Sequence, residues 1–350
     1  MFSASLRAAL VLLAASAPAV SAVPGLSLQV AGPTVVNGVE NLQVVATLTN
    51  TGDETLKLLK DPNSVLHTMP ADTFAIATED GASPSFVGVR LKYSPIQTSR
   101  STDAAAFVIL APGASVSVTH DLSSSYDFTN TGHRNYTITA ASNRFQFLGS
   151  NDELSEINAT PGPTHTAALS GGLLRRPGLL KRASFNGCSD DQQATLLTAA
   201  SSAQDYASEA ASYLGAHSDG TPRYTTWFGA YDSAHHDTVQ SHFDSLNGNS
   251  FSDFTYDCTC TDSTVFAYVY PDQFGTVYLC GAFWNAPSTG ADSQAGTLVH
   301  EATHFTANGG TKDYAYGREN CQALAQSNPD EAVFNADNHE YFAENTPPLE

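Results

Sequence analysis

The sequence has few basic residues: 15 lysines and arginines stand against 35 aspartates and glutamates, which gives a formal net charge of −20. Nucleic-acid-binding proteins need a basic face for the phosphate backbone, so this balance excludes nucleic acid as a partner. After the N-terminus, no apolar run approaches the length of about 18 residues that a membrane-spanning helix requires. The 41% apolar content argues against disorder. We therefore expect folded domains without a membrane or nucleic-acid partner.

Lysine is nearly absent from one part of the chain, and cysteine is absent from the other. Residues 183–350 contain 22 acidic and three basic residues, and Lys312 is their one lysine. Residues 1–182 contain 13 acidic and 12 basic residues and no cysteine, so all five cysteines lie in the second segment. A chain of 350 residues can form two domains with sizeable cores. The composition change predicts a boundary near residue 182.

Two processing signals agree with this division. Arg7 precedes a short apolar run over residues 8–15, and Val20-Ser21-Ala22 fits a signal-peptidase site. The dibasic pair Lys181-Arg182, of the type cut by secretory convertases, lies at the charge boundary. We predict a signal peptide over residues 1–22, a propeptide over 23–182 and a mature domain over 183–350. The expected product is secreted and extracellular.

The propeptide alternates β-prone runs with turns. The runs at residues 26–30, 43–48 and 136–140 are examples, and their spacing predicts a β-sandwich-like domain. This segment has no cysteine, so a propeptide thiol cannot act as an inhibitory group.

The mature segment begins with helices. A capping box at Ser189–Gln192 precedes apolar residues at helical spacing, and Gly215 is expected to end this helix. A second helix is expected over residues 233–246, where three histidines, the last of them His242, are interpreted as surface residues. Two strands at 264–270 and 276–280 predict a hairpin, whose edge could bind an extended peptide. The fold class is thus α+β, mainly helical with a small antiparallel sheet.

The residues with candidate catalytic side chains lie after residue 299. His300-Glu301-Ala302-Thr303-His304 has the pattern His-Glu-x-x-His. Histidines four residues apart on a helix face the same side and can bind one zinc ion, and Glu301 can take a proton from a metal-bound water. Asp292 or Ser293 can cap this helix.

A catalytic zinc ion needs a third protein ligand. Asp313 follows a turn at Gly309-Gly310 that could return its carboxylate to the metal. Glu319 and Glu331, on a following helix, are the alternatives that the residues leave open.

The two motifs together resemble those of the aspzincin metalloendopeptidases, which are secreted, largely fungal zinc proteases that include deuterolysin. Their pattern, His-Glu-x-x-His followed by Gly-Thr-x-Asp-x-x-Tyr-Gly, is complete over residues 300–304 and 310–317. Further stretches at 221–229, 274–284 and 335–342 resemble the peptidyl-Lys metalloendopeptidases of basidiomycete fungi. The resemblance covers essentially all of residues 183–350 and implies a zincin-like fold.

The resemblance also implies roles for particular residues. One Zn²⁺ ion would be bound by His300, His304 and Asp313. Glu301 would be the general base, and Tyr316 would donate a hydrogen bond to the oxyanion.

For substrate binding, the resemblance implies that Asp337 and Glu340 line the pocket for the residue after the scissile bond, where they would hold a lysine ammonium group. It also implies the disulfides Cys188–Cys258 and Cys260–Cys280. Cys321 departs from this four-cysteine pattern.

These features predict a zinc-dependent endopeptidase that cleaves on the amino side of lysine. Its expected partners are lysine-containing proteins and peptides and, before processing, its own propeptide, and the enzyme is expected to be a monomer. Two alternatives remain: a deuterolysin-like protease of broader specificity, and a non-catalytic secreted binding protein that keeps the zincin fold.

Overall fold

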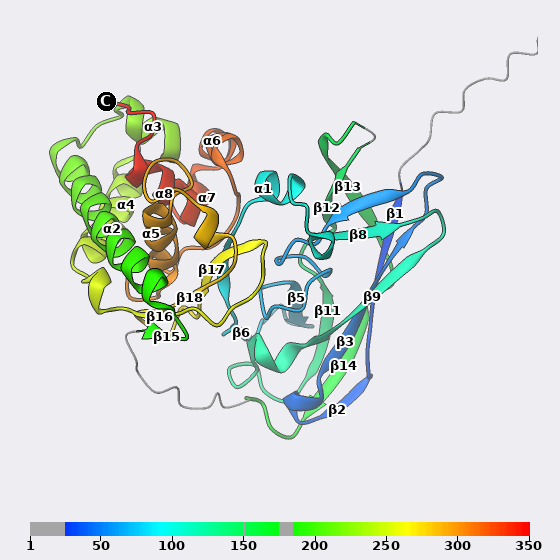
Figure 1. Cartoon of the computed structure of the whole chain (residues 1–350). Helices are drawn as coiled ribbons and strands as arrows, with labels where there is room; N and C mark the ends of the chain where they lie inside the picture. The colour runs from blue at the N-terminus through cyan, green and yellow to red at the C-terminus, as the bar shows by residue number, and fades with distance from the viewer. Residues whose placement is uncertain (1–24, 150, 175–184) are drawn as a thin grey trace, which may run out of the picture.

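The computed structural model describes residues 25–149, 151–174 and 185–350. The expected signal peptide and the Lys181-Arg182 site lie outside these residues. Figure 1 shows the strands of the N-terminal segment on one side of the molecule and the helices of the C-terminal segment on the other. Within the described ranges, no helix combines the length and apolar character that crossing a bilayer requires.

The regular elements of the N-terminal segment, residues 25–149 and 151–174, are mostly strands. Their bounds are β1 Leu26–Ala31, β2 Val35–Asn37, β3 Gln43–Asn50, β4 Leu56–Leu59, β5 Phe74–Thr78, β6 Ser85–Phe86, β7 Arg90–Tyr93, β8 Phe107–Leu110, β9 Ser115–Asp121, β10 Tyr126–Asp127, β11 Asn135–Ala140, β12 Arg144–Leu148, β13 Leu154–Pro161 and β14 His165–Ser170. A short helix, α1 (Pro95–Ser99), follows β7.

Two sheets of this segment share one hydrophobic core. The larger sheet has the order β8-β4-β12-β13-β1-β3-β9, and the smaller one has the order β2-β14-β11-β5. Along β3 the burial alternates, as expected for a strand with one face on the core. Leu48 of the larger sheet and Ile138 of the smaller sheet belong to the same buried cluster. The strands expected at 26–30, 43–48 and 136–140 are confirmed as β1, β3 and β11.

The C-terminal segment is dominated by helices. Their bounds are α2 Asp190–Ala216, α3 Pro222–Phe228, α4 Ser233–Asn247, α5 Gln294–His304, α6 Arg318–Ser327, α7 Pro329–Ala332 and α8 Ala336–Glu344. The strands are β15 Phe185–Asn186, β16 Thr255–Asp257, β17 Val265–Val269 and β18 Thr276–Leu279.

The first long helix begins as the sequence predicts and ends slightly later. Both hydrogen bonds of the capping box between Ser189 and Gln192 are present at the start of α2. The expectation that Gly215 ends the helix is wrong, because α2 continues through Ala216 and His217 is its C-cap. The His217 ring also donates from Nδ1 to the Tyr213 carbonyl at 2.8 Å, which satisfies an otherwise unpaired group at the helix end.

The histidines of α4 correct a second expectation. His236 and His242 are buried, with 5% and 7% exposure, although the sequence interpretation put them on the surface. His242 Nδ1 lies 3.0 Å from His339 Nε2 of α8, so the ring is accommodated by a polar partner inside the core.

The sheet beside these helices is mixed rather than antiparallel. Its order is β15-β16-β18-β17-β7, and the pairs β15–β16 and β16–β18 are parallel. The expected small antiparallel sheet is therefore only partly right: the predicted hairpin of β17 and β18 is antiparallel. The parallel pair β15–β16 is possible because helices α2 to α4 provide the long crossover that parallel strands need.

The fifth strand of this sheet, β7, comes from the N-terminal segment. It pairs antiparallel with β17, with Lys92 opposite Ala267 and Leu91 opposite Tyr268. Leu91 packs in a buried cluster with Val265 and Cys280 of the C-terminal segment. The two segments are thus joined by a shared sheet and a small shared core.

Two disulfides link the cysteines as the resemblance implies, Cys188 to Cys258 and Cys260 to Cys280. Cys321, the fifth cysteine, is a buried free thiol on α6.

Candidate active site

Helix α5 carries the His-Glu-x-x-His motif and is buried along its whole length. Ser293, not Asp292, is the N-cap, and its hydroxyl accepts a hydrogen bond from the Gly296 N–H at 2.9 Å. Glu344 of α8 anchors the cap by accepting bonds from the Ser293 N–H and hydroxyl. A side chain at Gly296 would collide with Glu344, since an added Cβ would lie 2.1 Å from its Oε1. The glycine therefore allows α5 and α8 to approach closely.

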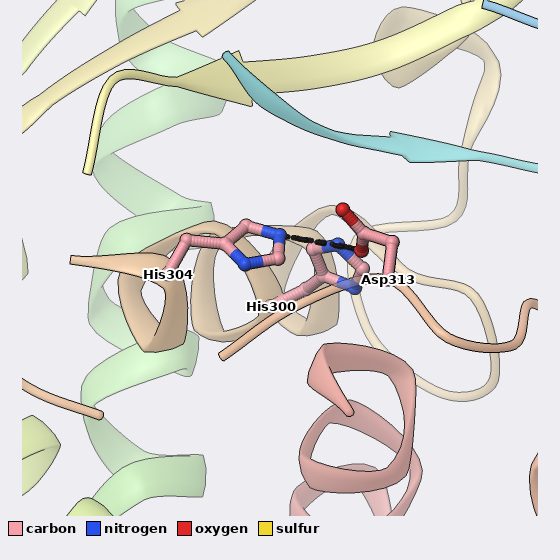
Figure 2. A group of neighbouring side chains, drawn as sticks. All are labelled: His300, His304 and Asp313. Atoms are coloured by element: carbon pink, nitrogen blue, oxygen red, sulfur yellow. Dashed lines mark hydrogen bonds and ion pairs between the residues drawn. The ribbon is translucent and has the colours of Figure 1, made fainter. Parts of the chain in front are cut away.

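Three side chains converge at the end of α5 (Figure 2). The Nε2 atoms of His300 and His304 lie 3.1 Å apart. Asp313 Oδ1 lies 3.2 Å from the first of these nitrogens and 3.4 Å from the second. Asp313 returns to the helix because the loop turns sharply at Gly310, whose φ is +57°.

The loop between the helix and Asp313 is pinned at both ends. His304 Nδ1 lies 3.0 Å from the Thr311 carbonyl, which fixes the ring so that Nε2 faces Asp313. The Lys312 N–H donates to the Phe334 carbonyl at 2.8 Å, and the Lys312 carbonyl accepts from the Ala336 N–H at 3.0 Å. These bonds tie the loop to the start of α8.

The three side chains fit a metal ion. Both carboxylate oxygens of Asp313 are buried and lack a hydrogen-bond donor within the described chain. Burial alone would raise the pKa of Asp313, but His304 and His300 hold it well below its usual range, so the group is a carboxylate. Two imidazole nitrogens and one carboxylate oxygen, all within 4.8 Å of one another, form a donor set suited to zinc. Over the parts of the chain that the structure describes, the candidate metal groups include neither Glu319 nor Glu331.

Helix α8 supports this cluster from the other side. Asp337 Oδ1 lies 2.8 Å from His300 Nδ1, and Asp337 Oδ2 accepts a bond from the Gly317 N–H. Glu340, one turn later, brings Oε2 to 3.4 Å from the same His300 nitrogen. A carboxylate on the far nitrogen of a histidine fixes its tautomer and ring orientation. Asp337 therefore holds the His300 ring in the orientation that turns Nε2 toward Asp313.

Glu301 and Tyr316 flank a single peptide bond of β7. Glu301 Oε1 accepts a hydrogen bond from the Lys92 N–H at 3.0 Å. The Tyr316 hydroxyl donates to the Leu91 carbonyl at 2.7 Å and accepts a bond from Asn63. Burial, with Asp313 nearby, raises the pKa of Glu301 to about 8, and burial raises the pKa of Tyr316 well above its usual range. Tyr316 is therefore a neutral donor.

The side chain of Lys92 enters an acidic pocket. It is only 1% exposed, and its ammonium group contacts Glu340 and lies 3.8 Å from Asp292 Oδ1. Burial alone would lower the pKa of Lys92, but Glu340 and Asp337 raise it above the usual value, so the side chain is charged. The Lys92 Nζ atom lies over the ring of Phe266, 5.2 Å from the centroid.

The sequence did not indicate three of these residues. Lys92 and Asn63 are more than 200 positions from the motif, and nothing in their own surroundings marks them. The sequence indicates Asp292 only as a helix cap. Its backbone is in the left-handed region, with φ +52°, a conformation that aspartate adopts more often than most residues other than glycine.

Comparisons with known proteins identify the family of this chain. A family model described as lysine-specific metallo-endopeptidase, Aspzincin_M35, matches residues 213–344. A peptidyl-Lys metalloendopeptidase of Grifola frondosa is 56% identical over 351 residues, covering 99% of both chains. The chain belongs to the aspzincin metalloendopeptidases. A peptidyl-Lys metalloendopeptidase of Pleurotus ostreatus is 57% identical to this aspzincin over 167 residues, which are 48% of this chain and 99% of that protein.

A solved structure, a zinc peptidase from Grifola frondosa, is 61% identical to this aspzincin. It covers 47% of this chain and 100% of its own, with a TM-score of 0.46.

Proposed function

We propose that this chain is a secreted zinc endopeptidase proenzyme that cleaves peptide bonds on the amino side of lysine. Residues 1–22 are its signal peptide, 23–182 its propeptide and 183–350 its mature domain. The Pleurotus relative supports this division, since almost all of it aligns over 167 residues, close to the length of 183–350. The signal pattern and the two disulfides support an extracellular destination.

The proposal rests mainly on one observation. The Leu91–Lys92 peptide bond lies between Glu301 and Tyr316. The ammonium group of Lys92 contacts Glu340. The carbonyl carbon that an endopeptidase attacks is thus on the amino side of that lysine. Arginine, with a larger planar guanidinium group, is a poor substitute in a closed pocket of this type.

The residues can be assigned complementary roles in hydrolysis. His300, His304 and Asp313 would hold one zinc ion, which supplies a Lewis acid and an acidified water molecule. Glu301 takes a proton from the attacking water and delivers it to the leaving nitrogen, which its carboxylate already contacts. Tyr316 donates its phenolic hydrogen to the carbonyl oxygen on which negative charge develops. Neither residue forms a covalent intermediate.

Three carboxylates select lysine at the position after the scissile bond. Glu340 contacts the ammonium group directly, Asp292 lies at the pocket's more exposed side, and Asp337 adds negative charge from beside His300. A charged lysine placed here is stabilised, whereas a neutral side chain leaves buried carboxylates without a counter-ion.

Mapping of cleavage sites in a denatured, lysine-containing protein tests the proposal. Activated enzyme should produce new N-termini that begin with lysine, and a chelator should abolish them until zinc is restored. New N-termini without a lysine preference would support a deuterolysin-like protease of broader specificity instead. Bound zinc without any cleavage would support a non-catalytic binding protein.

A further inference from the structure

Strand β7 occupies the site in the way that an extended substrate would. Its four residues add to the edge of the sheet, antiparallel to β17, which is a common way for proteins to bind peptides. Leu91 and Lys92 are almost completely buried between the two segments. The strand therefore fills the space that a peptide needs in order to reach the three metal-binding side chains.

The polar contacts of the Leu91–Lys92 bond are those that hydrolysis requires. The carbonyl oxygen accepts from Tyr316, the amide nitrogen donates to Glu301, and the following ammonium group contacts Glu340. A strand that ran in the opposite direction would not present its carbonyl, its amide and the following ammonium group to Tyr316, Glu301 and Glu340. A strand that merely filled the cleft would have no reason to do so.

The rest of the N-terminal segment holds the strand in place. Asn63 donates to the Tyr316 hydroxyl at 2.8 Å, His67 Nε2 lies 2.9 Å from Asp262 Oδ2, and Ser263 donates to Asp103 at 2.7 Å. Because the strand belongs to the same chain, its effective concentration at the cleft is very high. A free peptide would have to displace it before binding.

We propose that β7 is the segment that keeps the proenzyme inactive, and that its Leu91–Lys92 bond is a self-cleavage site. In this reaction water adds across the bond: the Leu91 carbonyl carbon gains the hydroxyl, and the Lys92 nitrogen gains a proton and becomes the amino group of a new chain end. No oxidation is involved. The cut divides β7 and removes the continuity that holds Lys92 in the pocket. This inference rests on the proposed cleavage before lysine.

The test uses the full chain, purified with a chelator and then supplied with zinc. N-terminal sequencing and intact mass should reveal a fragment that begins at Lys92, and it should increase in parallel with activity on an added lysine peptide. Glu301→Gln should produce no such fragment. Activation without any chain beginning at Lys92 would overturn the self-cleavage site.

Two matched substitutions test the inactivation. Lys92→Met should raise the activity of the uncleaved full chain on a lysine peptide at least tenfold. Lys57→Met should leave it unchanged, because Lys57 lies within the N-terminal segment, 4.1 Å from the Phe107 ring. Equal inactivity of both variants and the wild type would refute the role of Lys92.

A measurement without zinc separates these effects from misfolding. In the metal-free full chain, the β17 amides should exchange hydrogen slowly in the wild type and at least tenfold faster in Lys92→Met, with α2 equally protected in both. If activated enzyme cleaves external substrates before lysine but these results fail, only the present inference is wrong. If it shows no lysine preference, the proposed function fails first.

Discussion

Replacement of Glu340 by glutamine should selectively remove the preference for lysine. Glu340 is fully buried and contacts the lysine ammonium group, whereas Asp292 is 39% exposed on its side chain and 3.8 Å away. Removing one partner of a buried ion pair costs about 3–5 kcal/mol, and about 1.4 kcal/mol corresponds to a factor of ten. We expect Glu340→Gln to lower kcat/KM for lysine substrates about 100-fold or more. A partly exposed pair contributes about 0.2–1 kcal/mol, so Asp292→Asn should lower it at most about fivefold.

The assay compares two peptides that differ only after the scissile bond, one with lysine and one with norleucine, which has the same stem without the ammonium group. Glu340→Gln should leave kcat/KM for the norleucine peptide within a few-fold of the wild type. Zinc content should also be unchanged. An equal loss on both peptides would refute the reasoning, since it would mean that Glu340 acts through His300, 3.4 Å away, rather than through lysine.

Two further substitutions and a change of pH have expected outcomes. Glu301→Gln should lower kcat about 10²–10⁴-fold while the zinc content of the protein stays the same, measured by elemental analysis; loss of zinc would contradict a role as base alone. Tyr316→Phe should lower kcat about 10²–10³-fold with little change in KM, and a change confined to KM would argue against transition-state stabilisation. Burial lowers the pKa of His242 to about 4 and, with His242 beside it, that of His339 to about 3, so both are neutral when folded. In the unfolded chain both histidines have a pKa near the ordinary value of 6.5, so the unfolded state binds protons at a higher pH than the folded state does. Thermal stability should therefore fall as the pH is lowered from about 6.5 to 4. A thermal midpoint that is constant across this window, or a drop that His242→Gln does not reduce, would contradict this.

The local features of the site could be predicted from the sequence because they depend on short spacings. Two histidines one helical turn apart must share a face, and the Gly-Gly turn brings Asp313 back to that helix. The capping box of α2 and the β17–β18 hairpin are similarly local. Their hydrogen bonds form between neighbours in the sequence, so the residues alone specify them.

The contacts across long distances could not be predicted in this way. The pairing of β7 with β17 joins residues about 170 positions apart, and Lys92 lies in an ordinary β-prone run. The burial of His242 depends on His339 from α8, which no local pattern connects to α4. Nothing in the sequence indicates a mixed sheet, since β15 becomes the partner of β16 only after three helices have been packed between them.

The loop that carries Asp313 has a consequence for the lifetime of the enzyme. Residues 183–350 contain one lysine, Lys312, so under the proposed processing and specificity the mature domain would hold one target for its own activity. The Lys312 side chain is exposed, but its N–H and carbonyl are both bonded to the start of α8, and Thr311 is buried. A peptide bond can enter a cleft of this kind only when the residues around it form an extended segment that is free of such contacts. The turn that brings Asp313 to His300 and His304 therefore also keeps the Thr311–Lys312 bond from being presented to such a cleft.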